Sequence, residues 1–257
     1  MAGSLRERAD RAPEARLLYR PVALGLAVVL LALAAVEAVQ QALSAWGAAY
    51  AGTDLTQGYL PGAQRWLSTG SPYTAEQLAG PWVLEAHSFI HPPAALPLFA
   101  AFLVLPIVLW WAVPIGVTAL AVARMRPAPW SWPLMAACLV WPRSPGSLIS
   151  GNSDMWAMAA VGAGAVWGWP IVLLAVKPTF APLALVAVRN RWAWVAGAIV
   201  ALPMLLMLPL WFDWLRVIAN ASLPLTYSVL NLPLVLLPAV AWAARAGRPR
   251  QSARTID

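Results

Sequence analysis

The chain has 257 residues, of which 61% are hydrophobic and only 11% charged, and its formal net charge is +7. About a quarter of the residues of a soluble globular domain are charged, so this composition, with a mean hydropathy of +0.69, excludes that class. We predict an integral membrane protein with an all-α fold, a polytopic bundle of six to eight transmembrane helices that forms a single domain over residues 1–257.

The first apolar run, residues 22–43, is long enough to cross a hydrocarbon core of ~30 Å. It is too long for a cleavable signal peptide, and no small-residue cleavage motif follows it, so we expect it to remain as an anchor. Basic tails, 1–20 and 246–257, are predicted at the two ends of the chain. Their arginines indicate cytoplasmic N- and C-termini in a bacterial-type plasma membrane, and nucleic acid is not an expected partner.

The positive-inside rule orders the remaining segments. With the N-terminus inside, residues 44–92 are extracytoplasmic, and we predict next a short Pro-initiated outer helix that breaks near Pro106 before one span. Two full spans at 93–104 and 106–123 are the alternative, which would export Arg124 and Arg126. Further spans are expected at 127–142, 192–210 and 229–244, while 151–188 forms either one long crossing or three short ones.

The loop 44–92 contains both histidines of the chain and is predicted to be ordered. Apolar residues recur at helical spacing from Leu60 to Leu67, Pro61 suits a first helical turn, and Gly70 suits the end of the helix. Thr74 and Gln77 have the spacing of a capping box for a second short helix.

Asp54 lies just beyond the outer end of the first span. A carboxylate at the bilayer edge could take a proton from an acceptor hydroxyl that attacks a sugar carbon. The alternative is an aspartate that caps a short helix.

Three further groups of residues are candidates for binding. Asn152 and Asp154 are expected to begin a helix whose N-terminus suits phosphate or hydroxyl groups, or they only cap that helix. Lys177 interrupts an apolar run and either meets a lipid-linked phosphate or snorkels from a helix end. His87 and His91 could contact phosphate, transfer a proton or have no catalytic role.

A series of short motifs runs along the chain. It comprises Asp54-Leu55 with Tyr59, then Ala63 and the run Leu67 to Tyr73, His91-Pro92-Pro93, Gly151-Asn152-Ser153-Asp154 and Lys177-Pro178. Taken in order, these short motifs resemble the GT-C class of membrane glycosyltransferases, in particular glycosyltransferase family 87, whose members depend on polyprenyl-phosphate mannose. Full-length relatives generally carry several more helices after the Lys-Pro region, so the resemblance implies a short or truncated member.

The resemblance implies inverting transfer of a sugar, typically mannose, from a polyprenyl-phosphate donor to a hydroxyl of a lipid or glycan acceptor on the extracytoplasmic side. By position, Asp54 would be the general base. No DxD motif is present, so the sequence requires no metal and no cofactor. The residues expected to bind substrate are Tyr59, Arg65, Tyr73, His87, His91, Arg143, Asn152, Asp154 and Lys177.

Two other functions stay open at this point. A non-catalytic member of the fold would bind a lipid-linked sugar or act as a scaffold for another membrane enzyme. A lipid or sugar transporter would also carry broken helices and a buried lysine, although the sequence shows no inverted repeat. An enzyme should gather Asp54, Asp154, Lys177 and one histidine around one outward-facing cavity.

Overall fold

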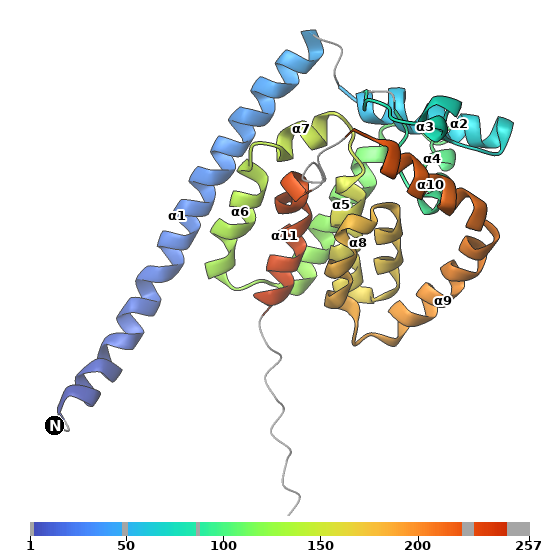
Figure 1. Ribbon diagram of the computed structural model, residues 1–257. Helices are drawn as coiled ribbons and strands as arrows, with labels where there is room; N and C mark the ends of the chain where they lie inside the picture. The colour runs from blue at the N-terminus through green and yellow to red at the C-terminus, as the bar shows by residue number, and fades with distance from the viewer. Residues whose placement is uncertain (1–2, 48–50, 86–87, 223–228, 246–257) are drawn as a thin grey trace, which may run out of the picture.

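The computed structural model describes residues 3–47, 51–85, 88–222 and 229–245, and within them the protein is all helical and contains no strand (Figure 1). His87 and the tail 246–257 therefore lie outside the described residues. The α-helices are α1 Gly3–Gly47, α2 Leu60–Thr69, α3 Ala75–Ala79, α4 Leu96–Ala101, α5 Leu109–Met125, α6 Trp132–Val140, α7 Ser144–Ile149, α8 Asp154–Trp167, α9 Arg191–Leu206, α10 Leu208–Asn220 and α11 Leu232–Ala243.

Several short helices of other types connect them. A π-helical turn, η1 (Asp54–Tyr59), leads directly into α2, and short 3-10 turns precede α4, α6 and α11. Two longer 3-10 segments, η4 (Trp169–Val176) and η5 (Pro178–Ala187), follow α8. Residues 151–188 thus form three short helical pieces and not one continuous helix, while the predicted membrane crossings of this stretch stay a prediction.

Helix α8 is the centre of the fold, since its residues from Asp154 to Gly164 are all buried. Helices α5 and α11 pack along it together with η4, and α6 packs against α11 on the outer side (Figure 1). The long helix α1 leans against α6 and α7. The segment η1 is joined to the turn before α8 by the hydrogen bond from the Asp54 amide to Ser150 O, and α2, α3 and α4 lie close together in Figure 1.

The local predictions for the loop 44–92 are confirmed. Helix α2 contains Pro61 in its first turn and ends at Gly70, which has the left-handed φ of 84°. The Thr74 hydroxyl and the Gln77 amide form the reciprocal hydrogen bonds of a capping box at α3. The predicted break before the second apolar helix is also present, because α4 ends at Ala101 and α5 begins at Leu109.

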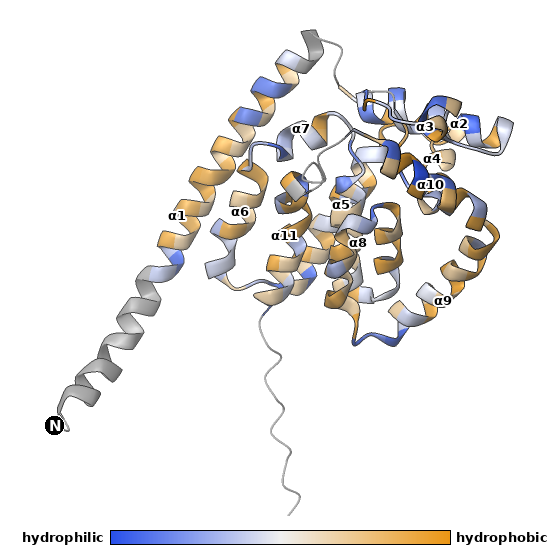
Figure 2. Cartoon of the chain, in the orientation of Figure 1, coloured by the Kyte–Doolittle hydropathy of each residue, from blue (hydrophilic) through white to orange (hydrophobic). Residues whose placement is uncertain are grey.

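Of the described helices, the segment Tyr19–Ser44 of α1 has the length and apolar composition needed to cross a bilayer. Helices α9 and α10 supply a second such segment if the two, bent by 84°, are counted together. Most of the large apolar side chains of α1 are exposed, and Figure 2 shows this hydrophobic band on the helix. The structure thus agrees with one or two membrane spans. The six to eight spans expected from the sequence stay a prediction.

Packing between α2 and the segment before α4 can be tested at Gly62. A methyl group there would lie 2.6 Å from Cγ and 2.8 Å from Cε2 of the buried Phe89 ring. We expect Gly62→Ala to destabilise the protein by about 1–3 kcal/mol, because the ring cannot move without disturbing the core. The measurement is the thermal unfolding midpoint in detergent. Gly116→Ala in α5, where nothing lies within 4 Å, is the control, and equal midpoints for the two variants would contradict this packing.

Candidate functional site

Two backbone segments meet at the N-terminal end of α8. The amide of Gly52 donates to Ile149 O at 2.9 Å, and the amide of Asp54 donates to Ser150 O at 2.9 Å. Gly52 and Gly151 both have left-handed φ values, 73° and 77°, which glycine adopts without strain. The start of η1 is therefore fixed to the turn between α7 and α8.

Two tryptophans of α5 donate hydrogen bonds to the backbone of this turn. Trp110 Nε1 donates to Gly151 O at 2.8 Å, and Trp111 Nε1 donates to Leu148 O at 2.7 Å. In the structure their N–H groups satisfy backbone carbonyls of the turn that carries the site.

The side chain of Asp54 is held by two neutral donors. Its Oδ2 atom accepts a hydrogen bond from Asn152 Nδ2 at 2.7 Å and one from Ser150 Oγ at 3.0 Å. Burial raises the pKa of the Asp54 carboxyl above its ordinary value of 3.8, while these two hydrogen bonds act in the opposite direction. Asp54 is thus a stronger base than an exposed aspartate.

Asn152 links Asp54 to a buried ion pair. Its Oδ1 atom accepts from Lys177 Nζ at 2.9 Å and from the Asp154 amide at 3.1 Å. Lys177 also forms an ion pair with Asp154 Oδ1, and the other oxygen, Oδ2, accepts from Asn231 Nδ2 at 2.7 Å. We call Asp54, Ser150, Asn152, Asp154, Lys177 and Asn231 the polar cluster.

The polar cluster differs in exposure from one end to the other. The Asp154 side chain is fully buried, and that of Lys177 is 12% exposed. Asp54 is only partly buried, so it is the carboxylate of the cluster that a bound molecule can reach. With both carboxylates ionised, the cluster has one more negative than positive charge.

Tyr59 and His91 are buried aromatic residues that pack next to the polar cluster. The Tyr59 hydroxyl accepts from the Ser153 amide at 3.3 Å, and its ring stacks on Phe99 and meets the His91 ring edge-on, with centroids 4.6 Å apart in each pair. Burial raises the pKa of Tyr59 well above its ordinary value, so it is a neutral phenol. Its role here is to position the start of α8.

His91 is buried and uncharged at neutral pH. Burial and the nearby charge of Lys177 lower its pKa from 6.5 to about 3. Its Nδ1 lies 3.4 Å from Val176 O, which can only accept, so Nδ1 carries the proton. His91 thereby fixes the backbone next to Lys177 and is not available as an acid near pH 7.

The other residues predicted to bind substrate lie outside the polar cluster. Arg65 Nη1 donates to Pro72 O at 2.6 Å, and the buried Tyr73 hydroxyl donates to His91 O at 2.8 Å, so both make backbone contacts within the loop. Arg143 is exposed at the start of α7, at the opposite end of that helix from Ser150. His87 lies outside the described residues.

Two members of the polar cluster were not singled out from sequence. Ser150 lies in the stretch that precedes Asn152, and a hydroxyl there resembles any turn residue. Asn231 had a detectable signal, because it is the one amide between Val229 and Ala244, a run predicted to be a span. Polar side chains in such runs are expected to pair within the bundle.

The ion pair between Lys177 and Asp154 gives a stability test. We expect Lys177→Met to destabilise the protein by about 3–5 kcal/mol, because it leaves the buried Asp154 carboxylate without its cation. The double variant Lys177→Met with Asp154→Leu should recover much of that loss, since no buried charge then remains. Unfolding midpoints of the wild type and the three variants, including Asp154→Leu alone, provide the measurement. Additive losses in the double variant would contradict the coupling.

Comparison of the chain with protein-family models, with curated proteins and with solved structures finds no match in any of the three. The geometry of the polar cluster is therefore the basis for assigning a function. That geometry joins three of the sequence-predicted residues, Asn152, Asp154 and Lys177, to Asp54.

Proposed function

We propose that the protein is a multi-pass membrane glycosyltransferase of the GT-C type, which transfers a sugar, mannose being the expected one, from a polyprenyl-phosphate donor to an acceptor hydroxyl. The observation that carries this proposal is the position of Asp54, a partly buried carboxylate with a raised pKa, linked through Asn152 to Lys177. In this reaction Asp54 accepts the proton of the acceptor hydroxyl. The hydroxyl oxygen bonds to the anomeric carbon as the bond from that carbon to the phosphate oxygen breaks, with inversion.

Membrane insertion with six to eight spans is part of this proposal. Its support is the exposed apolar surface of α1 together with three shorter apolar segments, Leu109–Met125, Pro178–Ala187 and Leu232–Ala243. The proposed orientation places the polar cluster on the extracytoplasmic side and the termini in the cytoplasm.

An apolar groove that begins one residue after Lys177 supports a lipid-linked donor. It has a volume of about 650 Å³ and is lined from Pro178, the residue after Lys177, along η5 to Leu185 and Val188 and across to Trp194 and Trp211. A polyprenyl chain in this groove would bring its phosphate to the Lys177 end. The hydrocarbon would then contact side chains of its own polarity.

A second candidate function is the binding of a lipid-linked sugar without catalysis. One observation favours it, because the charge of Lys177 is already balanced by Asp154 within the polar cluster. A leaving phosphate gains most from a cation that is not neutralised by a carboxylate. The asparagine and aspartate oxygens would still bind sugar hydroxyls.

Substitution of the proposed base separates these two candidates. We expect Asp54→Asn to reduce transfer from polyprenyl-phosphate mannose by about 10²- to 10⁴-fold, because the amide cannot accept the proton. Folding should be retained or slightly improved, because the raised pKa means that the ionised carboxylate destabilises the folded state at neutral pH. The measurements are the initial rate of product formation by mass spectrometry and the unfolding midpoint.

The matched control is Asp213→Asn in α10. This aspartate faces Arg216 at 3.7 Å and is not a member of the polar cluster, so its variant should turn over at the wild-type rate. Equal rates for the wild type and Asp54→Asn would contradict the assigned base. If the wild type and both variants bind the donor but none of them transfers the sugar, the result would favour the binding function.

The pH dependence of transfer tests the surroundings of Asp54. Activity should fall as the pH drops through the raised pKa of Asp54, because only the carboxylate accepts a proton. Asn152→Ala removes the hydrogen bond that most lowers this pKa, so the acid limb of kcat/KM should move to higher pH. Ser150→Ala should move it in the same direction by less. An acid limb that stays in place or moves to lower pH in Asn152→Ala would contradict the assignment.

A further inference from the structure

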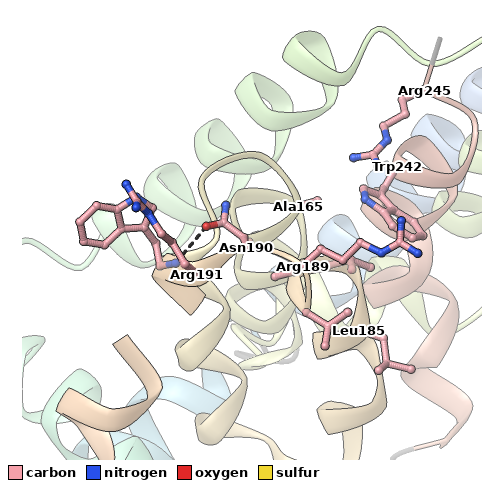
Figure 3. Close-up of a pocket in the computed structure, with 12 residues that line it drawn as sticks. Ala165, Leu185, Arg189, Asn190, Arg191, Trp242 and Arg245 are labelled. Atoms are coloured by element: carbon pink, nitrogen blue, oxygen red, sulfur yellow. Dashed lines mark hydrogen bonds between the residues drawn. The ribbon is translucent and has the colours of Figure 1, made fainter. Parts of the chain in front are cut away.

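A second pocket lies at the opposite end of α8 from the polar cluster. It has a volume of about 720 Å³, and we call it the basic pocket (Figure 3). Gly164 in its wall is ten residues after Asp154, a separation of about 15 Å along the helix. Its lining includes Ala165, Leu185, Arg189, Arg191, Trp242 and Arg245.

The basic pocket concentrates positive charge that is not balanced locally. Arg189 lies in the connection before α9, Arg191 is the first residue of that helix, and Arg245 follows α11, so segments distant in sequence supply the three guanidinium groups. No acidic side chain lines the pocket, and the ion pairs found between described residues involve Lys177 and Arg216 instead. Guanidinium groups bind phosphate oxygens through paired hydrogen bonds.

Cation–π contacts and backbone hydrogen bonds order the residues that line the basic pocket. The Arg245 guanidinium lies 5.0 Å from the centre of the Trp242 ring, and Arg191 lies 5.3 Å from that of Trp192. Asn190 Oδ1 accepts from the Trp192 amide at 3.0 Å, the bond drawn in Figure 3. The Ala128 amide donates to Ala244 O at 2.9 Å and so fixes the backbone before Arg245. The arginines are therefore presented from ordered backbone.

The basic pocket is also continuous with an apolar surface. Leu185 and Val188 line both this pocket and the apolar groove, at the end of the groove about 14 Å along η5 from Pro178. A ligand with an anionic head and a hydrocarbon chain matches both surfaces. A free anion would use only the arginines.

We propose that the basic pocket binds the phosphate headgroup of an anionic phospholipid. This inference rests on the membrane insertion proposed above and not on the transfer reaction. Basic pockets between helices at the cytoplasmic side of a membrane bind phosphorylated headgroups in this way. The lipid would hold η5, the start of α9 and the end of α11 together.

The test measures binding of phosphatidylglycerol to the purified full chain in an uncharged detergent. Phosphatidylglycerol should raise the unfolding midpoint and remain bound in native mass spectra, and phosphatidylcholine should do neither. The variant Arg189→Gln/Arg191→Gln/Arg245→Gln should bind phosphatidylglycerol about a hundredfold more weakly, because each arginine contributes attraction to an anionic lipid.

The matched control removes the same amount of charge at the same end of the protein but outside the pocket lining. It is Arg20→Gln/Arg124→Gln/Arg126→Gln, three exposed arginines whose loss should leave the affinity within about threefold of wild type, since only longer-range attraction is lost. An equal loss in both triple variants would overturn the pocket, because surface charge alone would explain the binding. Protection by inorganic phosphate equal to that by phosphatidylglycerol would overturn the lipid as ligand.

Two further measurements keep the outcome independent of folding and of catalysis. Arg189→Gln alone changes one exposed side chain, and it should weaken binding about fivefold if the triple variant does not fold. Unchanged affinity in this single variant would overturn the assignment of that arginine to the site. Asp54→Asn should bind phosphatidylglycerol like the wild type, so a failure of the proposed transfer reaction would leave this result intact.

Discussion

The buried carboxylate of Asp154 is the constraint on which the rest of the site depends. A fully buried charge costs several kcal/mol unless a cation and hydrogen-bond donors surround it. Lys177 and Asn231 supply these, and they come from the junction of η4 with η5 and from the start of α11. Three segments far apart in sequence must therefore meet at the first residue of α8. The apolar helices pack around that point.

The same constraint orients the proposed base. Because Asn152 Oδ1 accepts from Lys177 and from the Asp154 amide, the amide nitrogen of Asn152 is directed to Asp54. The Asp54 carboxylate is thus oriented, through Asn152, by a charge pair to which it has no direct hydrogen bond. As a consequence, Asp154 neutralises the positive charge of Lys177 inside the protein. The three arginines of the basic pocket lie at the other end of α8, and no acidic side chain lines that pocket.

Features that depend on neighbouring residues were predictable. The bounds of α2, the capping box of α3, the break between α4 and α5 and the start of α8 near Asp154 each follow from a local signal that acts within one or two turns. Helix lengths after Gly151 were less predictable. The apolar stretch that follows α8 contains prolines at positions 170, 178 and 182, which cannot donate a backbone hydrogen bond. This stretch folds as the 3-10 segments η4 and η5, which pack on α8, and not as one span.

The sequence by itself determined the all-helical class and the residue types on which a site could be built, namely Asp54, Asn152, Asp154 and Lys177. Only the tertiary structure decided how they pair, that Ser150 and Asn231 complete the cluster, and that Arg65 and Tyr73 make backbone contacts instead. It also made His91 a neutral residue. The physical reason is that hydrogen-bond partners and desolvation depend on positions in space, and a pair such as Asn152 and Asp54 is 98 residues apart in the chain.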